Sequence, residues 1–157
     1  MGAFGRNAFR VYVLLLGIWT GSGIHDTAST HFAWWADPVV WYARPAWAGM
    51  VNPWPFSTML LLLATLVAGV VAWRYRGPGR KPALISLAGT ALILVATLAW
   101  FVPQLGLMGS GRLDEAALVA HGRTWIVLNA ARLVLLLALL WSALLALGRI
   151  GERTGKG

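Results

Sequence analysis

The chain has 157 residues, of which 59% are hydrophobic and only 11% are charged, and it contains no cysteine. A soluble globular protein carries about 25% charged residues, so this composition favours a membrane protein. The lack of cysteine excludes disulfides, thiolate metal ligands and a cysteine nucleophile. The net charge of +8 comes from 13 Lys+Arg against 5 Asp+Glu.

Four apolar stretches follow one another along the chain, and each is long enough to span a bilayer. They lie at residues 8–28, 56–73, 83–102 and 123–147. A run of about 18 or more apolar residues predicts a transmembrane helix. We expect Pro103 to end the third helix, because proline lacks the backbone donor that a helix interior needs. The first stretch has no clear signal-peptidase site, so it is predicted to stay as a helix.

Positive charges are concentrated in the segments that these helices would leave on one side of the membrane. Segments 25–55 and 103–123 instead carry four of the five acidic residues. Because positively charged loops stay in the cytoplasm, both termini are predicted to be cytoplasmic and these two segments to lie outside. The charge therefore indicates topology and contact with anionic lipid, not nucleic-acid binding. The nine residues on the predicted cytoplasmic side are Arg6, Arg10, Arg74, Arg76, Arg80, Lys81, Arg149, Arg153 and Lys156.

The connection between the second and third stretches contains Gly77-Pro78-Gly79, which is typical of a tight turn. Short connections make successive helices antiparallel neighbours. We therefore expect an all-α fold: one domain over residues 1–157, forming an integral membrane, antiparallel four-helix bundle. Abundant arginine and alanine with only two lysines favour a bacterial source, and hence a bacterial plasma membrane. Membrane lipids are the expected partners, and homo-oligomerisation stays open.

The long segment 25–55 holds five of the ten tryptophans: Trp34, Trp35, Trp41, Trp47 and Trp54. A loop of this length is uncommon unless it has a function. One interpretation is an aromatic belt at the level of the lipid headgroups. The other is a lid over a cavity between the helix ends. Residues 37–47 begin with Asp37-Pro38, which is typical of a helix N-cap followed by a first-turn proline, so a short amphipathic helix is predicted there.

The start of the fourth stretch carries a polar stripe. Trp125, Asn129 and Arg132 are spaced by four and three residues, which places them on one helix face, and His121 lies one turn earlier. Arg132 comes nine residues after Arg123, about 13 Å along the axis, so we expect it near the middle of the apolar layer. Charges at that depth usually face the interior of the bundle and need partners.

The nearest acidic residues to Arg132 are predicted to be Asp26 and Asp37. We expect the outer ends of the first and fourth helices to face each other and to enclose a pocket. A purely structural Arg–Asp clamp is the main alternative, as is a role for Asn129 in joining helices. Further polar atoms on the first helix come from Thr20, Ser22 and Thr27. The expected pocket contains His25, Asp26, His121, Asn129 and Arg132.

A metal or haem site is a less favoured alternative. Three histidines are present, His25, His31 and His121, but no pair has the compact spacing typical of metal ligands. We therefore predict no metal ligand and no resident cofactor.

The stretch "FVPQLGLM…HGRTWIVLNAARLVLLLALL" resembles the last third of the anthrone oxygenase-like membrane proteins, a group of four-helix proteins of mostly unknown function. The likeness consists of a Pro103-Gln104 step, an acidic loop at residues 114–115, and the Trp/Asn/Arg face that opens the last helix. Two features depart from the family pattern. Gln104 stands where the family often has asparagine, and the Trp/Pro-rich loop that ends in "NPWPF" has no counterpart there.

The resemblance implies oxidation of an aromatic anthrone to a quinone by dioxygen as co-substrate, without metal or organic cofactor. In such chemistry a base removes a C–H proton beside a carbonyl, and a cation or amide stabilises the enolate. His121 or His25 would be the base, with Arg132 and Asn129 as the anion site. The alternatives are a non-catalytic accessory or scaffold subunit for another membrane protein and, less favoured, a lipid or metabolite transporter. Candidate contacts to the hydrophobic substrate are Trp125, Asp26, Trp34, Trp35 and Trp100.

Overall fold

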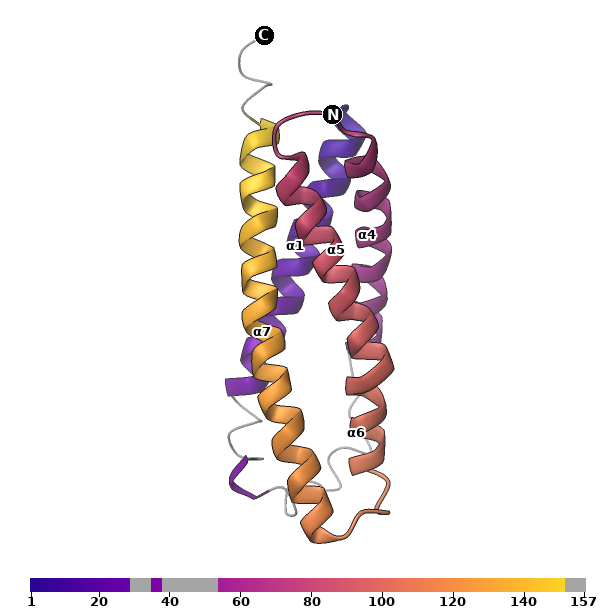
Figure 1. Ribbon diagram of the computed structural model, residues 1–157. Helices are drawn as coiled ribbons and strands as arrows, with labels where there is room; N and C mark the ends of the chain where they lie inside the picture. The colour runs from indigo at the N-terminus through magenta and orange to yellow at the C-terminus, as the bar shows by residue number, and fades with distance from the viewer. Residues whose placement is uncertain (29–34, 38–53, 152–157) are drawn as a thin grey trace.

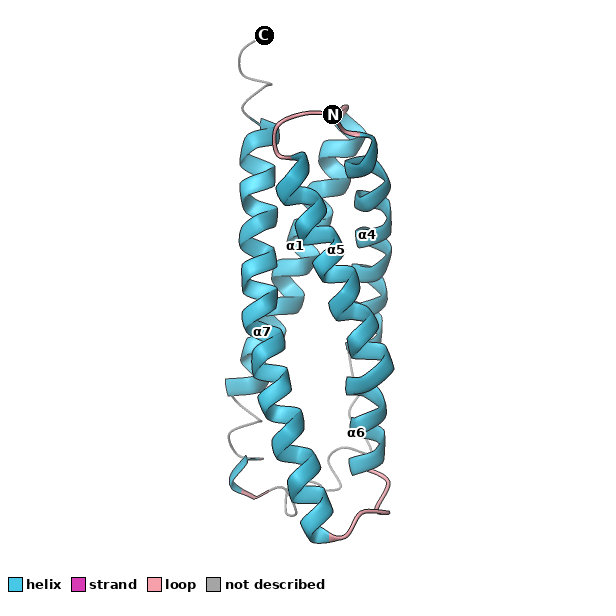
Figure 2. Cartoon of the chain, in the orientation of Figure 1, coloured by secondary structure: helices cyan, strands magenta, loops and turns pink. Residues whose placement is uncertain are grey.

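The computed structural model describes residues 1–28, 35–37 and 54–151, and in this part of the chain all regular structure is helical (Figures 1 and 2). This confirms the all-α prediction. The long helices are α1 (Ala3–Asp26), α4 (Trp54–Arg74), α5 (Arg80–Ala96) and α7 (Glu115–Gly151), and the short α6 (Val102–Met108) follows α5. The predicted amphipathic helix at residues 37–47 lies outside the described residues apart from Asp37.

The four long helices lie side by side and alternate in direction along the chain (Figure 1). α1 packs against α4 and α7, and α5 packs against the same two helices. Each long helix therefore packs most extensively against two of the others, and its buried face belongs to the shared core.

Within the described ranges, three helices are long and apolar enough to cross a membrane: Phe56–Arg74, Arg80–Met108 and Glu115–Ile150. The remaining predicted span, the first, corresponds to α1, which is 24 residues long but less apolar. Its crossing of the membrane therefore stays a prediction. At 1.5 Å per residue, Phe56–Arg74 is about 28 Å long, close to the roughly 30 Å apolar thickness of a bilayer.

The prediction that Pro103 ends the third helix is wrong. α5 continues through a π-helical turn, Thr97–Phe101, directly into α6, in whose first turn Pro103 lies. Here the helix is continuous, since the Val102 N–H still donates to the Thr97 carbonyl, and proline is tolerated in such a helix where a π-helical turn adjusts the neighbouring hydrogen bonds. The helical segment ends instead at Met108, before Gly109 and the turn at Gly111, whose φ is +69°.

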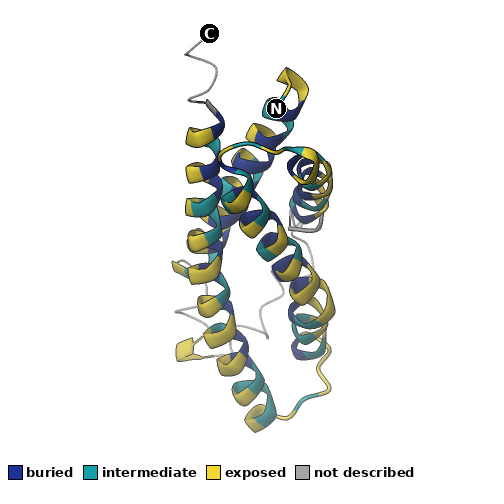
Figure 3. Cartoon of the chain, turned by 45° about the horizontal axis from the view of Figure 1, so that its top comes forward, coloured by how far each residue is buried: buried dark blue, intermediate teal, exposed yellow. Residues whose placement is uncertain are grey.

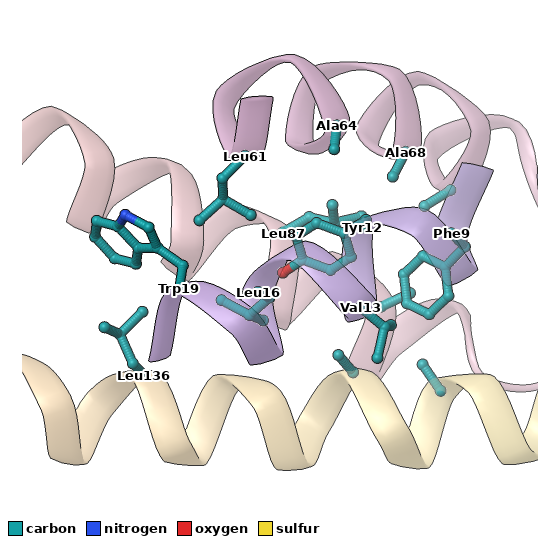
Figure 4. Packing of buried hydrophobic residues seen from close by; sticks show 14 of the residues in the cluster. Phe9, Tyr12, Val13, Leu16, Trp19, Leu61, Ala64, Ala68, Leu87 and Leu136 are labelled. Carbon is teal, nitrogen blue, oxygen red and sulfur yellow. The ribbon is translucent and has the colours of Figure 1, made fainter. Parts of the chain in front are cut away.

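The main core lies between the four long helices, and the exposed residues lie on their outward faces (Figure 3). Many of these exposed residues are large and apolar. Figure 4 shows Phe9, Tyr12 and Leu16 of α1 lying between α4 and α7. Large side chains face outward, such as Leu63 at 60% and Val134 at 67% exposure. An apolar exterior of this extent is expected of a helical protein in contact with lipid.

Hydroxyl groups link the helices inside this core. Tyr12 Oη lies 2.7 Å from Ser86 Oγ and 2.8 Å from Thr90 Oγ1, and Ser86 Oγ donates to the Leu139 carbonyl at 2.9 Å. These contacts join α1, α5 and α7. Interhelical hydrogen bonds of this kind help to hold helices together where the surroundings are as apolar as the core itself.

Candidate functional site

Arg132 lies between three helical segments and donates to neutral groups. Its Nη1 donates to Thr97 Oγ1 at 3.2 Å, and its Nη2 donates to Asn129 Oδ1 one turn earlier on α7. The third nitrogen, Nε, is buried and has no acceptor among the described residues. The guanidinium therefore keeps an unused donor in a shielded position, where an unsatisfied polar group is costly.

Two aromatic rings flank the guanidinium. Its central carbon lies 4.5 Å from the ring centre of Phe101 and 5.4 Å from that of Trp19. A cation within about 6 Å of a ring face is attracted by the ring quadrupole. Trp19 is itself oriented by donation from Nε1 to Thr58 Oγ1 at 3.3 Å. The rings thus replace part of the solvation that the cation loses, although they supply no negative charge.

Asn129 joins α7 to the end of α1. Its Nδ2 donates to Thr27 Oγ1 at 3.2 Å, and Thr27 Oγ1 donates to the Gly23 carbonyl at 2.8 Å. The C-terminal end of α1 therefore does face the polar stripe of α7, as expected from the sequence. Thr27, which was foreseen only as an extra polar group, is the residue that makes this contact.

The π-helical turn supplies the third side of the site. Thr97, its first residue, donates to the Ile93 carbonyl at 2.7 Å and accepts from Arg132. At the other end of the turn, the Phe101 carbonyl accepts from Trp125 Nε1 at 3.3 Å. Both ends of the turn are thus bound to α7. π-helical turns are rare and occur frequently at functional sites.

The depth of Arg132 in a membrane stays a prediction. Trp19, whose ring flanks the guanidinium, is bonded to Thr58 near the start of α4. Likewise Thr97 follows the 17 residues of α5, which rise roughly 25 Å from Arg80. The guanidinium is therefore level with the start of α4 and the end of α5, while Arg132 itself lies near the midpoint of the apolar stretch Glu115–Ile150 of α7. Helical side chains lean toward the N-terminus of their helix, and here that direction leads toward α6.

The expected pairing of Arg132 with Asp26 is not present. The described hydrogen bonds of the guanidinium go to Thr97 and Asn129, while Asp26 is half-buried at the last residue of α1 and Asp37 is exposed. The physical reason is that Thr27, one residue beyond Asp26, occupies the face of α1 that meets α7. Asp26 is rotated from that face by about 100°.

The histidines are placed apart from Arg132. His121 Nδ1 lies 3.0 Å from Gln104 Oε1 on α6, and His121 precedes Arg132 by eleven residues, roughly 16 Å along α7. His25 is exposed, and it lies two residues before Thr27, which contacts α7, so its side chain leaves roughly the opposite side of α1. The structure therefore does not bring either candidate base to the guanidinium. His31 lies outside the described residues.

The predicted aromatic contacts are divided between two places. Trp125 is buried and packs edge-on against Phe101, with ring centres 5.7 Å apart, and Trp100 packs against the same ring at 4.8 Å. Trp35 is 44% exposed, and the Arg123 guanidinium lies 5.7 Å from its ring centre. Trp34 lies outside the described residues.

Thr97, Phe101, Trp19 and Gln104 were missed as site residues. Only Gln104 had a visible signal, because it follows the proline step. The other three lie in apolar or aromatic surroundings that are typical of any membrane helix, and the π-helical turn that presents two of them has no sequence signature. For metals, no three of the His, Asp and Glu residues in the described ranges gather as ligands would.

The fold and site thus define a helical protein with three apolar, membrane-length helices and a guanidinium held between α1, α7 and a π-helical turn. Comparison of the chain with protein-family models, curated proteins and solved structures finds no match.

Proposed function

We propose that the protein is a four-span integral membrane protein, with both termini in the cytoplasm of a bacterium. The outward apolar faces and the three membrane-length helices support the membrane location. α1 is proposed as the fourth span because it packs against α4 and α7 along the same bundle. The orientation rests on charge. The start of α1, the end of α4, the start of α5 and the end of α7 lie at the end of the bundle that holds the N-terminus (Figure 1). These helix ends carry Arg6, Arg74, Arg80 and Arg149, and positively charged segments stay inside.

We further propose that the site binds a hydrophobic aromatic molecule through a negatively charged or strongly polarised oxygen. The observation that carries this proposal is Arg132 itself: a shielded cation, flanked by Trp19 and Phe101, whose described partners are all neutral. An oxygen anion at Nε would supply both the missing acceptor and the missing charge. Flat aromatic molecules are suited to the surrounding rings and reach such a site from the lipid.

The reaction that we propose is oxidation of an anthrone-type substrate by dioxygen. Loss of a proton from the ring methylene leaves an enolate, whose oxygen Arg132 and Asn129 stabilise. The electron-rich carbon then reacts with dioxygen. One oxygen atom ends in the new carbonyl of the quinone, and the other leaves as water with the two methylene hydrogens. His121 and His25 stay candidate bases, and because both lie away from Arg132, the anion site is the part of the proposal that the geometry supports.

The test measures dioxygen uptake and quinone absorbance with a hydroxyanthrone and the full chain in lipid nanodiscs. Removing one oxyanion donor typically costs roughly 100-fold or more in rate, so Arg132→Leu should lose at least that. Arg123→Leu is the matched control, since Arg123 is exposed on the same helix, and it should stay within about twofold. Turnover by a folded Arg132→Leu variant at the wild-type rate would overturn the proposal.

A second readout covers the case in which Arg132→Leu fails to fold. Trp19 flanks the guanidinium, so a non-reacting hydroxyquinone bound there should quench tryptophan fluorescence in the wild type. Arg132→Lys keeps the charge but loses the forked geometry, and it should bind more weakly with the fold intact. Equal quenching in wild type and Arg132→Lys would argue against recognition by the guanidinium.

The non-catalytic alternative also has an observation in its favour. Arg132 and Asn129 together tie α7 to α1 and to the π-helical turn, which is what a structural clamp in a scaffold subunit would do. Under that alternative the hydroxyquinone does not bind the wild type at all, while substitution of Arg132 still lowers stability.

A further inference from the structure

A groove of about 570 Å³ lies at the turn between α4 and α5, at the end of the bundle opposite Arg132. It is lined by the turn itself, by the first residues of α5 and by Arg149 near the end of α7. Two chain segments that are far apart in sequence thus form one concave surface.

Gly79 brings these two segments together. Its φ is +87°, which favours glycine, and a Cβ at this position would lie 2.8 Å from the Ala146 carbonyl oxygen and 3.3 Å from Arg149 Cβ. The start of α5 can therefore pack directly on the last turns of α7. Arg149 therefore lines the same groove as Arg80 and Lys81.

The groove is strongly basic. Lys81 and Arg149 are exposed, whereas Arg80 is half-buried, with Nη2 donating to the Trp73 carbonyl at 3.4 Å and the guanidinium 5.9 Å from the Trp73 ring centre. Nε of Arg80 is buried and has no acceptor among the described residues. The carboxylates of the described chain, Asp26, Asp37, Asp114 and Glu115, all belong to segments at the other end of the bundle (Figure 1).

One wall of the groove continues into the apolar outer face. Leu84 and Ile85 line it one turn into α5, and Ile85 is 52% exposed. A ligand in this groove contacts the basic side chains at one end and the apolar side chains of Leu84 and Ile85 at the other. Basic pockets between helices on the cytoplasmic side of membrane proteins suit anionic lipid headgroups for this reason.

We propose that this groove binds the phosphate headgroup of an anionic phospholipid. The phosphate lies between Lys81, Arg149 and Arg80, and an acyl chain follows Ile85 along α5. The lipid would bridge α5 and α7, so its loss separates the two helix ends. This proposal does not depend on the oxygenase proposal, because it concerns the other end of the molecule and requires only that the helices lie in a membrane.

The test uses native mass spectrometry of the full chain in a neutral detergent, titrated with phosphatidylglycerol, phosphatidylcholine or inorganic phosphate. Lys81→Gln/Arg149→Gln removes two exposed charges from the groove while leaving Arg80 and its contact to Trp73. Arg6→Gln/Arg10→Gln removes two charges at the same end but outside the groove, and serves as the matched control. Arg6 and Arg10 lie at the start of α1.

We expect one phosphatidylglycerol to stay bound to the wild type and to the control pair. The groove pair should lose roughly 30-fold in affinity, since each cation near an anionic headgroup contributes on the order of fivefold. Equal losses in both pairs would mean non-specific attraction and overturn the proposal. So would equal retention of phosphatidylcholine, or displacement of the lipid by equimolar inorganic phosphate, which would indicate a site for free phosphate.

Discussion

Asn129→Leu should destabilise the fold although it changes the shape of the side chain little, because Asn129 accepts a hydrogen bond from the shielded cation of Arg132. The substitution keeps the branched shape and the number of side-chain heavy atoms but removes the two hydrogen bonds to Arg132 and Thr27. Loss of the acceptor for Arg132 should cost about 1.5–3 kcal/mol, the range for hydrogen bonds to charged groups. Loss of the donation to Thr27, a neutral interhelical bond, adds about 0.6 kcal/mol. The free energy of unfolding should therefore fall by about 2–3.5 kcal/mol.

A double-mutant cycle separates the two contributions. When Arg132→Met has already removed the cation, Asn129→Leu should cost only the neutral bond, about 0.6 kcal/mol. The coupling energy is then about 1.5–3 kcal/mol. The assay is unfolding by sodium dodecyl sulfate in mixed micelles, followed by circular dichroism, for the wild type, the two single variants and the double variant.

Additive effects would refute this reasoning. Changes at non-interacting sites add to within about 0.5 kcal/mol, so a coupling energy below that value means that the Arg132–Asn129 contact contributes nothing measurable. If the loss of stability in the double variant equals the sum of the losses in the two single variants, each residue stabilises the fold through other neighbours.

Three further outcomes follow from the fold. Gly79→Ala should lower the free energy of unfolding by about 1–3 kcal/mol, because a Cβ there is strained at φ +87° and meets an α7 carbonyl. Gly69→Ala has open space around it and should be neutral or stabilising. Thermal unfolding measures both variants. Tyr12→Phe should cost about 0.5–1.5 kcal/mol in the same assay by removing a hydroxyl shared by two partners, and an unchanged midpoint would contradict this. A membrane-impermeant maleimide should label Ser110→Cys in intact cells but Pro78→Cys only after permeabilisation, because the chain has no native cysteine and the basic turn is proposed to be inside. The reverse pattern would invert the topology.

The helices of the bundle were largely predictable, because apolar length is a local property. The second predicted span, 56–73, differs from α4 by two residues at its start and one at its end. The stripe of Trp125, Asn129 and Arg132 was also predictable from helical spacing. The depth of Arg132 in a membrane stays a prediction, because α7 begins at Glu115, eight residues before the span drawn from the sequence, so a distance counted from Arg123 does not mark a membrane boundary.

The residues that contact this stripe on other helices were less predictable than the stripe itself. Opposite charge favoured Asp26, yet contact depends on which face of α1 meets α7, and that face is set by packing of Trp19, Leu16 and Tyr12 against neighbouring helices. The role of Thr97 was not predictable from the sequence for a different reason. Its presentation requires a π-helical turn, and the residues of that turn have no unusual composition.

The π-helical turn also lets the α5–α6 segment hold one residue more than a regular helix would. The i→i+5 bonding of such a turn widens it, so the five residues Thr97–Phe101 turn through about the same angle as four α-helical residues. Deletion of a single residue within Thr97–Phe101 would therefore restore a regular helix and leave Gln104 on the side of His121, while Ser86 and Thr90 keep their contacts with Tyr12. The turn thus confines a change of chain length to the segment beside Arg132, and the helices on either side of it keep their neighbours.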